Sequence, residues 1–280
     1  MVARLLLFLL AGALAFAQPR RIVSTAPSIT EMLYALGLGD RVVGVTTFCH
    51  YPPEATRKPK IGNYLRPDTE AIVALRPDAV IAERSMIRRA IELPTLRLNV
   101  VEVDDATIPG VYASIHRIGE LAGVAGRAEA LCTSIRENLE GVRRRTARLP
   151  HPRVLFVVGR TPGKIEDLIV AGGASYLNEV LEIAGGANAV RDARTSYAKV
   201  SLEEVLARNP EVIIDMGEMS QTIGVTARDR RRVVELWGRY PSLAAVRGKR
   251  VYAVASDIYV VPGPRVVEAA REFARMLHGE

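Results

Sequence analysis

The sequence has few cysteines and few aromatic residues, and it lacks the motifs of several large enzyme classes. Its 280 residues include two cysteines, too few for a disulfide framework, and no C-x-x-C metal or redox pair. Aromatic residues make up 5% of the chain, with one tryptophan. The chain contains no G-x-x-x-x-G-K-[ST] phosphate loop, no G-x-S-x-G elbow and no H-E-x-x-H zinc helix. What remains is a globular composition, 49% hydrophobic and 25% charged, with no signature of a catalyst.

Metal and nucleic-acid sites are also not expected. The histidines are scattered without the i,i+4 spacing or carboxylate neighbours of a metal centre; they are His50, His116, His151 and His278. The net charge is +7, but the basic cluster 143–145 has no aromatic platform or nucleic-acid motif beside it. The cluster is therefore interpreted as a solvated helix face, and no nucleic-acid partner is predicted.

The first seventeen residues have the pattern of a secretion signal. Arg4 supplies the positive start, residues 5–16 are apolar, and Ala15-Phe16-Ala17 resembles a cleavage site. The apolar run is shorter than the roughly 18 residues that span a bilayer. No cysteine lies near the cut to accept a lipid. We therefore predict a free, monomeric periplasmic protein that begins at Gln18.

Strand-like and helix-like patterns alternate through the rest of the chain, which predicts an α/β fold with parallel, doubly wound sheets. Expected strands are 21–25, 41–46, 79–82, 100–103, 154–158, 211–214 and 250–254. Expected helices are 28–36, 68–75, 107–121, 175–183, 201–207, 229–237 and 264–277. Residues 127–149 break this alternation with a long helical stripe. We interpret it as a bridging helix (126–149) between an N-terminal lobe (18–125) and a C-terminal lobe (150–280).

An internal repeat supports two lobes. The segment 68–82 (DTEAIVALRPDAVIA) matches 201–214 (SLEEVLARNPEVII) at a constant offset of 133 residues. Both segments place a capping residue first, Glu70 or Glu203 third and a proline tenth, followed by a strand. Each lobe is therefore expected to carry the same helix–strand unit.

The two cysteines, Cys49 and Cys132, would lie in an oxidising compartment if the chain is exported. A disulfide between them is then allowed. Two separate thiols, one of them on a buried helix face, are the alternative, and the spacing does not decide between the two.

Aromatic residues gather in the loops that follow predicted strands, where ligands bind in open α/β sheets. These residues are Phe48, Tyr51, Tyr64, Tyr197 and Tyr259, and His50 lies among them. Loop aromatics can stack on a planar or macrocyclic ligand at low entropic cost. Any single tyrosine could instead pack its ring on the core, but their equivalent settings in two lobes favour a shared cleft.

Several motifs resemble the periplasmic substrate-binding proteins of ABC importers for cobalamin and iron–siderophores. The motifs are RIVS with PSITE (21–31), YPPEA (51–55), IVALRPD (72–78), NEVLE (178–182), Ser256-Asp257 and Pro264-Arg265. The resemblance covers most of the chain and is strongest to the cobalamin-binding branch. It implies two Rossmann-like lobes joined by one long helix, a small-molecule ligand in the cleft between them, and no cofactor.

The resemblance also implies roles for particular residues. Glu70 and Glu203 match the glutamates that dock on arginines of the membrane permease, which works with ATPase subunits. The alternative is that they only favour the helix dipole, and Ser201 with Glu204 can form a capping box.

The cleft-lining positions of the family map onto four tyrosines, namely Tyr51, Tyr64, Tyr197 and Tyr259. Tyr64, Tyr197 and Glu83 stand where cobalamin binders carry tryptophan, which leaves a ferric siderophore or haem open as the ligand. Arg66, Arg84 and Arg265 are candidate donors for such anionic ligands. A secreted enzyme or a ligand sensor is the distant alternative, with Asp257, His50 and Glu83 as its available polar groups.

Overall fold

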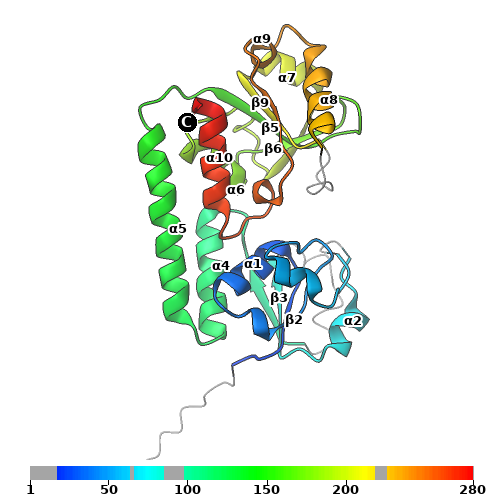
Figure 1. Cartoon of the computed structure of the whole chain (residues 1–280), viewed down its shortest axis with the longest axis vertical. Coiled ribbons are helices and arrows are strands. Elements are labelled where there is room, and N and C mark those ends of the chain that lie inside the picture. Colours follow the sequence, from blue (N-terminus) through cyan, green and yellow to red (C-terminus); the bar gives the residue numbers. More distant parts are fainter. Residues whose placement is uncertain (1–17, 64–65, 85–97, 218–225, 280) are drawn as a thin grey trace, which may run out of the picture.

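The computed structural model describes residues 18–63, 66–84, 98–217 and 226–279, and these form two lobes, each built on one sheet. Figure 1 shows the lobes one above the other, with the long helix α5 running beside both. Among the described residues, no helix is long and apolar enough to cross a membrane. The predicted signal segment 1–17 and Tyr64 lie outside the described residues.

The N-terminal lobe has a four-stranded, fully parallel sheet in the order β2-β1-β3-β4, as the alternating pattern predicts. Its strands are β1 (Ile22–Ser24), β2 (Val42–Gly44), β3 (Ala79–Glu83) and β4 (Val100–Val103). Its helices are α1 (Pro27–Ala35), α2 (Thr69–Ala74) and α4 (Ile108–Leu121), with short 3-10 turns η1 (Gly39–Arg41) and η2 (Pro53–Arg57).

The C-terminal lobe has a mixed sheet, so the prediction of parallel strands is only partly right there. The order is β10-β9-β5-β6-β8, and β6 and β8 run antiparallel to their neighbours. The strands are β5 (Arg153–Gly159), β6 (Leu168–Ala171), β7 (Ala187–Asn188), β8 (Tyr197–Val200), β9 (Val212–Asp215) and β10 (Val251–Ala253). The helices are α6 (Tyr176–Ile183), α7 (Leu202–Arg208), α8 (Ala227–Gly238), α9 (Ala244–Arg247) and α10 (Val266–His278), with η4 (Asp257–Tyr259). The missed strands β6, β7 and β8 are only four, two and four residues long, so they give little periodic signal.

The bridging helix α5 runs over Ala125–Thr146, three residues short of the predicted end. Its 22 residues span about 33 Å at 1.5 Å per residue. It buries one stripe, formed by Ala128, Cys132, Ile135, Leu139, Val142 and Thr146. The helix ends before Pro150 and Pro152, which cannot continue it.

One hydrophobic cluster extends through both lobes. It includes Ile22 and Ile81 of the first sheet, the buried stripe of α5, and Phe156 of the second sheet. The opposite face of each sheet packs against a smaller hydrophobic cluster of its own. Val80 of β3 belongs to the one in the N-terminal lobe, and Val157 of β5 to the one in the C-terminal lobe. Both sheets are therefore covered on both faces, and the inner layer is common to the whole molecule.

The sequence repeat is a structural repeat. Asp68 and Ser201 cap α2 and α7 by accepting backbone N–H groups of Ala71 and Glu204 at 3.0 and 3.2 Å. Eight residues after each cap, the chain turns through a left-handed conformation with φ of 45° at Arg76 and 43° at Asn209.

The strand that neighbours each repeat is attached in the same way. Arg21 and Arg153 open β1 and β5, and each donates its guanidinium to the carbonyl end of the repeat helix, at Leu75 (2.7 Å) and Asn209 (3.0 Å). Their backbone N–H groups donate to the carboxylates of Asp78 and Glu211, both at 2.9 Å. The repeat therefore fixes each helix to its sheet at the same place.

A buried ion pair joins β5 to β9 in the C-terminal lobe. Arg160 donates from Nε to Asp215 Oδ2 at 3.0 Å, and the two side chains are 4% and 0% exposed. Trp237 Nε1 donates to the same oxygen at 2.6 Å, and the Gly217 N–H donates to Oδ1 at 2.6 Å. Asp215 therefore satisfies three donors from three segments.

We expect Asp215→Ala to destabilise the protein by about 3–5 kcal/mol, because the Arg160 charge would stay buried without its partner. Urea unfolding followed by circular dichroism measures this loss. Asp167→Ala is the matched control, since Asp167 pairs with Lys199 at the surface and its loss should change the unfolding free energy little. Equal effects of both substitutions would contradict the interpretation.

Candidate functional site

The carboxyl ends of the N-terminal strands carry a group of acidic and hydroxyl side chains. Glu83 is the last residue of β3, Asp105 follows β4, and Ser28 lies in the first turn of α1 after β1. These strands are neighbours in one parallel sheet, so their ends lie at a common edge.

Ser28 links the two carboxyl groups of this edge. Its hydroxyl lies 3.3 Å from Glu83 Oε1, and its side chain also hydrogen-bonds Asp105. Asp105 is 7% exposed, and its Oδ2 has no hydrogen-bond partner among the described residues. Burial raises the pKa of Asp105 well above its usual value, and the nearby negative charge of Glu83 adds to this. Burial thus favours the protonated form of Asp105, which places an O–H donor beside the carboxylate of Glu83.

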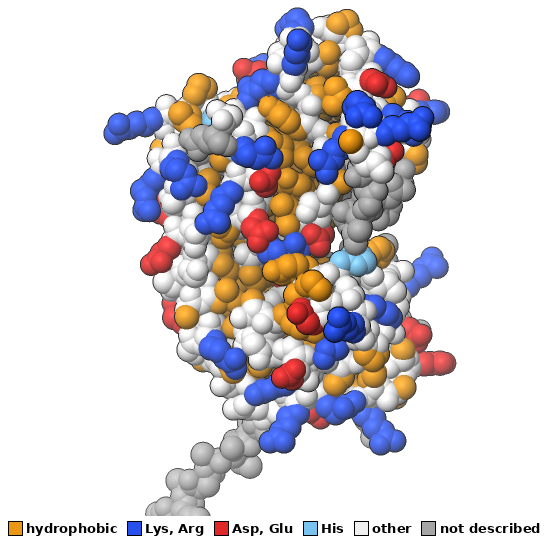
Figure 2. Space-filling view, viewed as in Figure 1, with side chains coloured by type: hydrophobic (Ala, Val, Ile, Leu, Met, Phe, Trp, Pro, Cys, Tyr) orange, Lys and Arg blue, Asp and Glu red, His pale blue; other side chains and the backbone are white. Residues whose placement is uncertain are grey.

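A charged cluster joins the two lobes. Arg265, at the start of α10, donates from Nε to Glu31 Oε2 of α1 at 3.0 Å, and a second bond joins its Nη2 to Glu31 Oε1. Its Nη1 donates to Asp257 Oδ1 at 3.0 Å. The guanidinium lies 4.0 Å from the centre of the Tyr51 ring. We call Glu31, Tyr51, Asp257 and Arg265 the inter-lobe cluster. Figure 2 shows side chains of both charge signs close together where the lobes meet.

The prediction that Arg265 lies beside the cleft is compatible with this position, but its guanidinium is already used by the protein. Two carboxylates accept from it, and its side chain is 11% exposed. Arg84 is likewise paired, with Glu102 and with Asp104 at 3.3 Å. Arg66 is exposed and donates its backbone N–H to Asn63. Two of the three candidate donors for an anionic ligand are therefore paired with carboxylates of the protein, Arg265 in the interior and Arg84 at the surface.

Three of the predicted aromatic residues are exposed. Phe48, Tyr51 and Tyr197 are 38%, 43% and 42% exposed, among the largest exposed fractions of any hydrophobic side chains described. His50 is half-buried in the turn that carries Phe48 and Tyr51. Tyr197 opens the edge strand β8, although a loop was predicted there.

Tyr176 connects these groups electrostatically. It begins α6 of the C-terminal lobe, and its backbone N–H donates to the Ala106 carbonyl of the N-terminal lobe at 2.8 Å. Burial raises the pKa of Tyr176 well above its usual value, and Tyr197, Asp105 and Glu31 raise it further by their charges. Charges of both lobes, Asp105 and Glu31 of the first and Tyr197 of the second, therefore act on Tyr176.

The prediction that Tyr259 lines the ligand cleft is wrong for its ring. Tyr259 is 5% exposed and stacks on Phe273, with ring centres 5.3 Å apart. Burial raises its pKa to about 12. The small exposed part borders a groove of about 750 Å³ between α8, β10 and α10. Tyr259 is thus the core-packed tyrosine that was the alternative for each loop aromatic.

The two glutamates singled out by the repeat are exposed at the starts of α2 and α7. Hydrogen bonds from its own backbone N–H and from Ser201 lower the pKa of Glu203. Glu203 also borders a hollow of about 600 Å³ with Lys164, Asp167 and Arg239. Both carboxylates can therefore reach a partner that approaches these helix starts.

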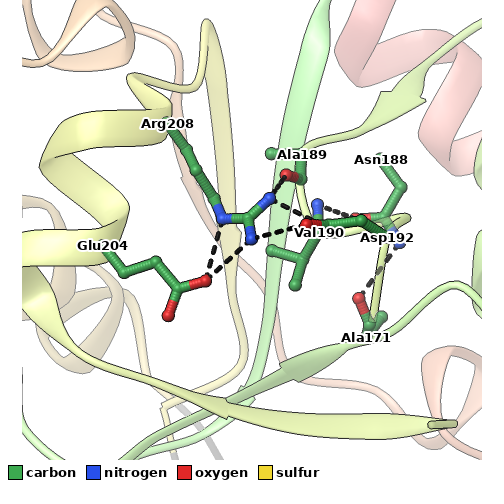
Figure 3. A network of polar contacts seen from close by, with 7 residues as sticks. All are labelled: Ala171, Asn188, Ala189, Val190, Asp192, Glu204 and Arg208. Carbon is green, nitrogen blue, oxygen red and sulfur yellow. Dashed lines mark hydrogen bonds and ion pairs between the residues drawn. The ribbon is translucent and has the colours of Figure 1, made fainter. Parts of the chain in front are cut away.

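A polar network holds α7 in place (Figure 3). Arg208 donates to both Asp192 oxygens at 2.8 and 3.0 Å, to Glu204 Oε1 at 2.8 Å and to the Ala189 carbonyl at 2.8 Å. The capping box expected for Ser201 and Glu204 is therefore only half formed, because the Glu204 carboxylate is drawn to Arg208. Glu203 is left as the acidic side chain of this turn that faces outward.

The allowed disulfide does not form, because Cys49 and Cys132 are both free and buried. Cys49 contacts the hydroxyls of Thr30 and Thr46 at 3.1 Å, inside the N-terminal lobe. Cys132 belongs to the buried stripe of α5, and burial raises its pKa to about 11. Each thiol fills its own part of the core.

Sequence reasoning missed Glu31 and Asp105. Glu31 lies in the PSITE motif and would be assigned to a solvated helix face, yet it is 3% exposed. Asp105 was hidden beside Asp104 at the end of a strand. A signal for both exists, since a carboxylate at a strand end or in the first helix of an α/β lobe lies near the ligand edge. In the parts of the chain that are described, no three metal-binding side chains come together.

The Periplasmic binding protein family matches residues 22–258. The chain is 33% identical to the uncharacterized ABC transporter substrate-binding lipoprotein YvrC of Bacillus subtilis, over 93% of this chain and 81% of that protein. It is 27% identical to the vitamin B12-binding protein of Photorhabdus laumondii, over 94% and 90% of the two chains.

Solved structures give the same picture. The periplasmic vitamin B12 binding protein BtuF of Vibrio cholerae matches with a TM-score of 0.76 and 26% identity, over 93% of this chain and 97% of that one. The periplasmic heme-binding protein RhuT of Roseiflexus matches with 0.74 and 26%, over 92% and 98%. The similarity in fold thus extends to proteins named for two different ligands.

We expect both cysteines to titrate as free thiols. Protein purified without reductant should react slowly with Ellman's reagent when native, because both sulfur atoms are buried, and release two equivalents per chain after unfolding in guanidinium. Reduced protein is the control and should give the same total. A total of zero before reduction would show that the disulfide forms after all.

Proposed function

The chain belongs to the periplasmic binding protein family, whose members are substrate-binding transport proteins and not enzymes, and from this premise we propose its ligand. It captures cobalamin or a related corrinoid between its lobes and delivers it to an ABC permease. Ferric siderophores and haem are the alternatives within the same family.

The observation that carries this proposal is the acidic group at the carboxyl edge of the N-terminal sheet. Glu83 offers a half-buried carboxylate beside the buried Asp105, while the guanidinium of Arg265 is already held by two carboxylates and that of Arg84 is paired at the surface. A corrinoid carries primary amides around its ring, and amide N–H groups donate well to carboxylates. Haem and most siderophores carry anionic groups, which Glu83 would repel.

The exposed aromatic residues support the same ligand. Phe48, Tyr51 and Tyr197 come from different lobes, and each leaves more than a third of its surface uncovered. Such rings supply large, rigid contact areas for the faces and edges of a flat macrocycle. Fewer indoles than in cobalamin binders would change the affinity, but stacking on tyrosine and phenylalanine remains available.

Haem is retained as the second candidate because one turn offers iron ligands. His50 and Tyr51 are neighbours in the exposed turn of the N-terminal lobe, and imidazole and phenolate are both axial ligands of haem iron. The acidic side chains nearby disfavour haem, because they would repel its two propionates.

The proposal includes the permease contact and the compartment. Glu70 and Glu203 present like charges from equivalent helix starts, which suits a partner with two-fold symmetry and two basic sites. Residues 1–17 are proposed as a cleaved secretion signal. The relative YvrC is named a lipoprotein; the thiols of Cys49 and Cys132 are both inside the core and cannot carry such a lipid.

Glu83→Lys distinguishes the ligand classes. For a corrinoid, the lysine removes an acceptor of amide N–H groups, and we expect the affinity for cyanocobalamin to fall about tenfold. For haem or an anionic ferric siderophore, the same change should strengthen binding through charge attraction. Calorimetric titration with cyanocobalamin, hemin and a ferric catecholate, which carries a net negative charge, measures all three.

Glu54→Lys is the control, because it makes the same charge change at an exposed position of η2. It should leave the three affinities close to those of the unmodified protein. If the unmodified protein does not bind cyanocobalamin at micromolar concentration, and binds hemin with a shifted Soret band instead, the corrinoid assignment is wrong.

Removing both docking carboxylates should separate transport from ligand binding. We expect Glu70→Ala with Glu203→Ala to weaken binding to the permease in nanodiscs by at least about tenfold, since two charge-assisted contacts are lost. Ligand affinity should not change. Glu54→Ala with Glu137→Ala removes two exposed carboxylates elsewhere and should preserve permease binding. A loss of ligand affinity in the first variant would instead place Glu70 or Glu203 in the ligand site.

A further inference from the structure

We infer that Arg265 is a positioning residue, which holds the two lobes in one orientation and holds the Tyr51 ring in place for the ligand. The resemblance to known binding proteins suggests a cleft arginine that contacts ligand. The contacts of the inter-lobe cluster assign it a different task, which concerns the protein's own geometry. The dependence of ligand affinity on this task rests on the proposed function, whereas the effect on the lobes does not.

The hydrogen bonds of Arg265 are nearly all internal. Nε and Nη2 bond Glu31 of the N-terminal lobe, while Nη1 and Nη2 bond Asp257 of the C-terminal lobe. The planar guanidinium of Arg265, with its five N–H donors, is thus held between two carboxylates. One of them, Glu31, lies 234 residues before Arg265 in the sequence. Such bidentate contacts fix both distance and angle.

Tyr51 forms the third side of this arrangement. The guanidinium carbon lies 4.0 Å from the ring centre, within the range of a cation–π contact. The side chain is nevertheless 43% exposed, so the arginine covers one part of the ring and leaves another accessible. The orientation of this exposed aromatic surface therefore depends on Arg265.

The inter-lobe cluster is one of two places in the described residues where polar groups of the two lobes bond each other directly. At the other, Tyr176 N–H donates to the Ala106 carbonyl at 2.8 Å, and Glu179 accepts the Ile108 N–H at 3.0 Å, between the starts of α6 and α4. A single attachment would allow rotation about itself. Two attachments in different elements, with α5 beside them, define one orientation of the lobes.

The surroundings of Glu31 make its contact with Arg265 decisive. The charged groups that act on it are Arg265, Asp257 and Glu268, so Arg265 is the one cation among them. Gly263 passes so close that an added Cβ would lie 3.0 Å from Glu31 Oε2. Without Arg265, the Glu31 charge would be buried beside two other carboxylates.

The cluster has a pH-dependent component. Burial raises the pKa of Glu31 to about 7, against the opposing effect of Arg265. Because the folded-state pKa lies above the usual 4.5, the contribution of Glu31 to folding stability is present at pH 4.5 and lost as the pH rises through 7. Its bond with Arg265 has the opposite dependence, since the charged bond is complete only above pH 7. Stability and lobe orientation should therefore respond to pH in opposite directions.

The distance between the lobes tests the proposal without any ligand. Spin labels at Arg57→Cys and Ser242→Cys, both at exposed positions, report one lobe each, and the native cysteines are buried. Pulsed electron resonance should give a narrow distance distribution at pH 8. We expect a broader or shifted distribution in Arg265→Gln, and an intermediate one in Arg265→Lys, which keeps the charge but loses the fork.

Two further variants serve as controls for the distance measurement. Glu31→Gln with Arg265→Gln removes both charges together, so it avoids an unpaired buried carboxylate if the single variant does not fold. Arg84→Gln removes an arginine that pairs within one lobe and should leave the distribution unchanged. A folded Arg265→Gln or double variant with the unmodified distribution would overturn the proposal.

Cyanocobalamin affinity supplies the second readout. Tyr51 positioning predicts about tenfold weaker binding in Arg265→Gln, and several-fold weaker binding of the unmodified protein at pH 6 than at pH 8. Glu31→Gln should remove this pH dependence. If the unmodified protein binds no cyanocobalamin, the proposed function fails while the distance experiment still decides the role of Arg265. If it binds but Arg265→Gln binds equally well, the positioning role fails.

Discussion

A hydrophobic layer shared by the two lobes is the constraint on which the candidate site depends. The buried stripe of α5 packs with the inner faces of both sheets, so neither lobe completes its core alone. This shared packing fixes the orientation of the two sheets. Polar groups at the strand ends of one lobe therefore face those of the other. The placement of Asp105, Tyr176 and Arg265 follows from apolar packing several residues away from each of them.

The layers of the fold could be predicted from local patterns. The first sheet, the long helix and the repeat at an offset of 133 residues each have local signals, which extend over about fifteen to twenty-five residues. These signals are apolar periodicity, capping residues and prolines. The antiparallel strands β6 and β8 could not, because they are only four residues each, too short to show a strand period. Their position is decided by pairing partners far along the chain, which local periodicity does not record.

The candidate site was predictable in its chemistry and less so in its contacts. Aromatic residues in strand-end loops include Phe48, Tyr51 and Tyr197, which are exposed, but the same pattern includes Tyr259, whose ring belongs to the core. Residue type does not tell which side of a loop faces the sheet. The pairing of Arg265 with Glu31 was equally hidden, since it joins positions 234 residues apart. A basic chain therefore has an acidic junction that no count of its charges indicates.

Gly263 adds a mechanical meaning to the junction. A Cβ added at this position would lie 3.0 Å from Glu31 Oε2. A larger residue here would therefore press on the carboxylate that Arg265 holds, so the glycine is what lets the two lobes meet this closely. The helix starts that carry Glu70 and Glu203 lie far out on the two lobes (Figure 1), so a small tilt introduced at position 263 would become a larger change in their separation.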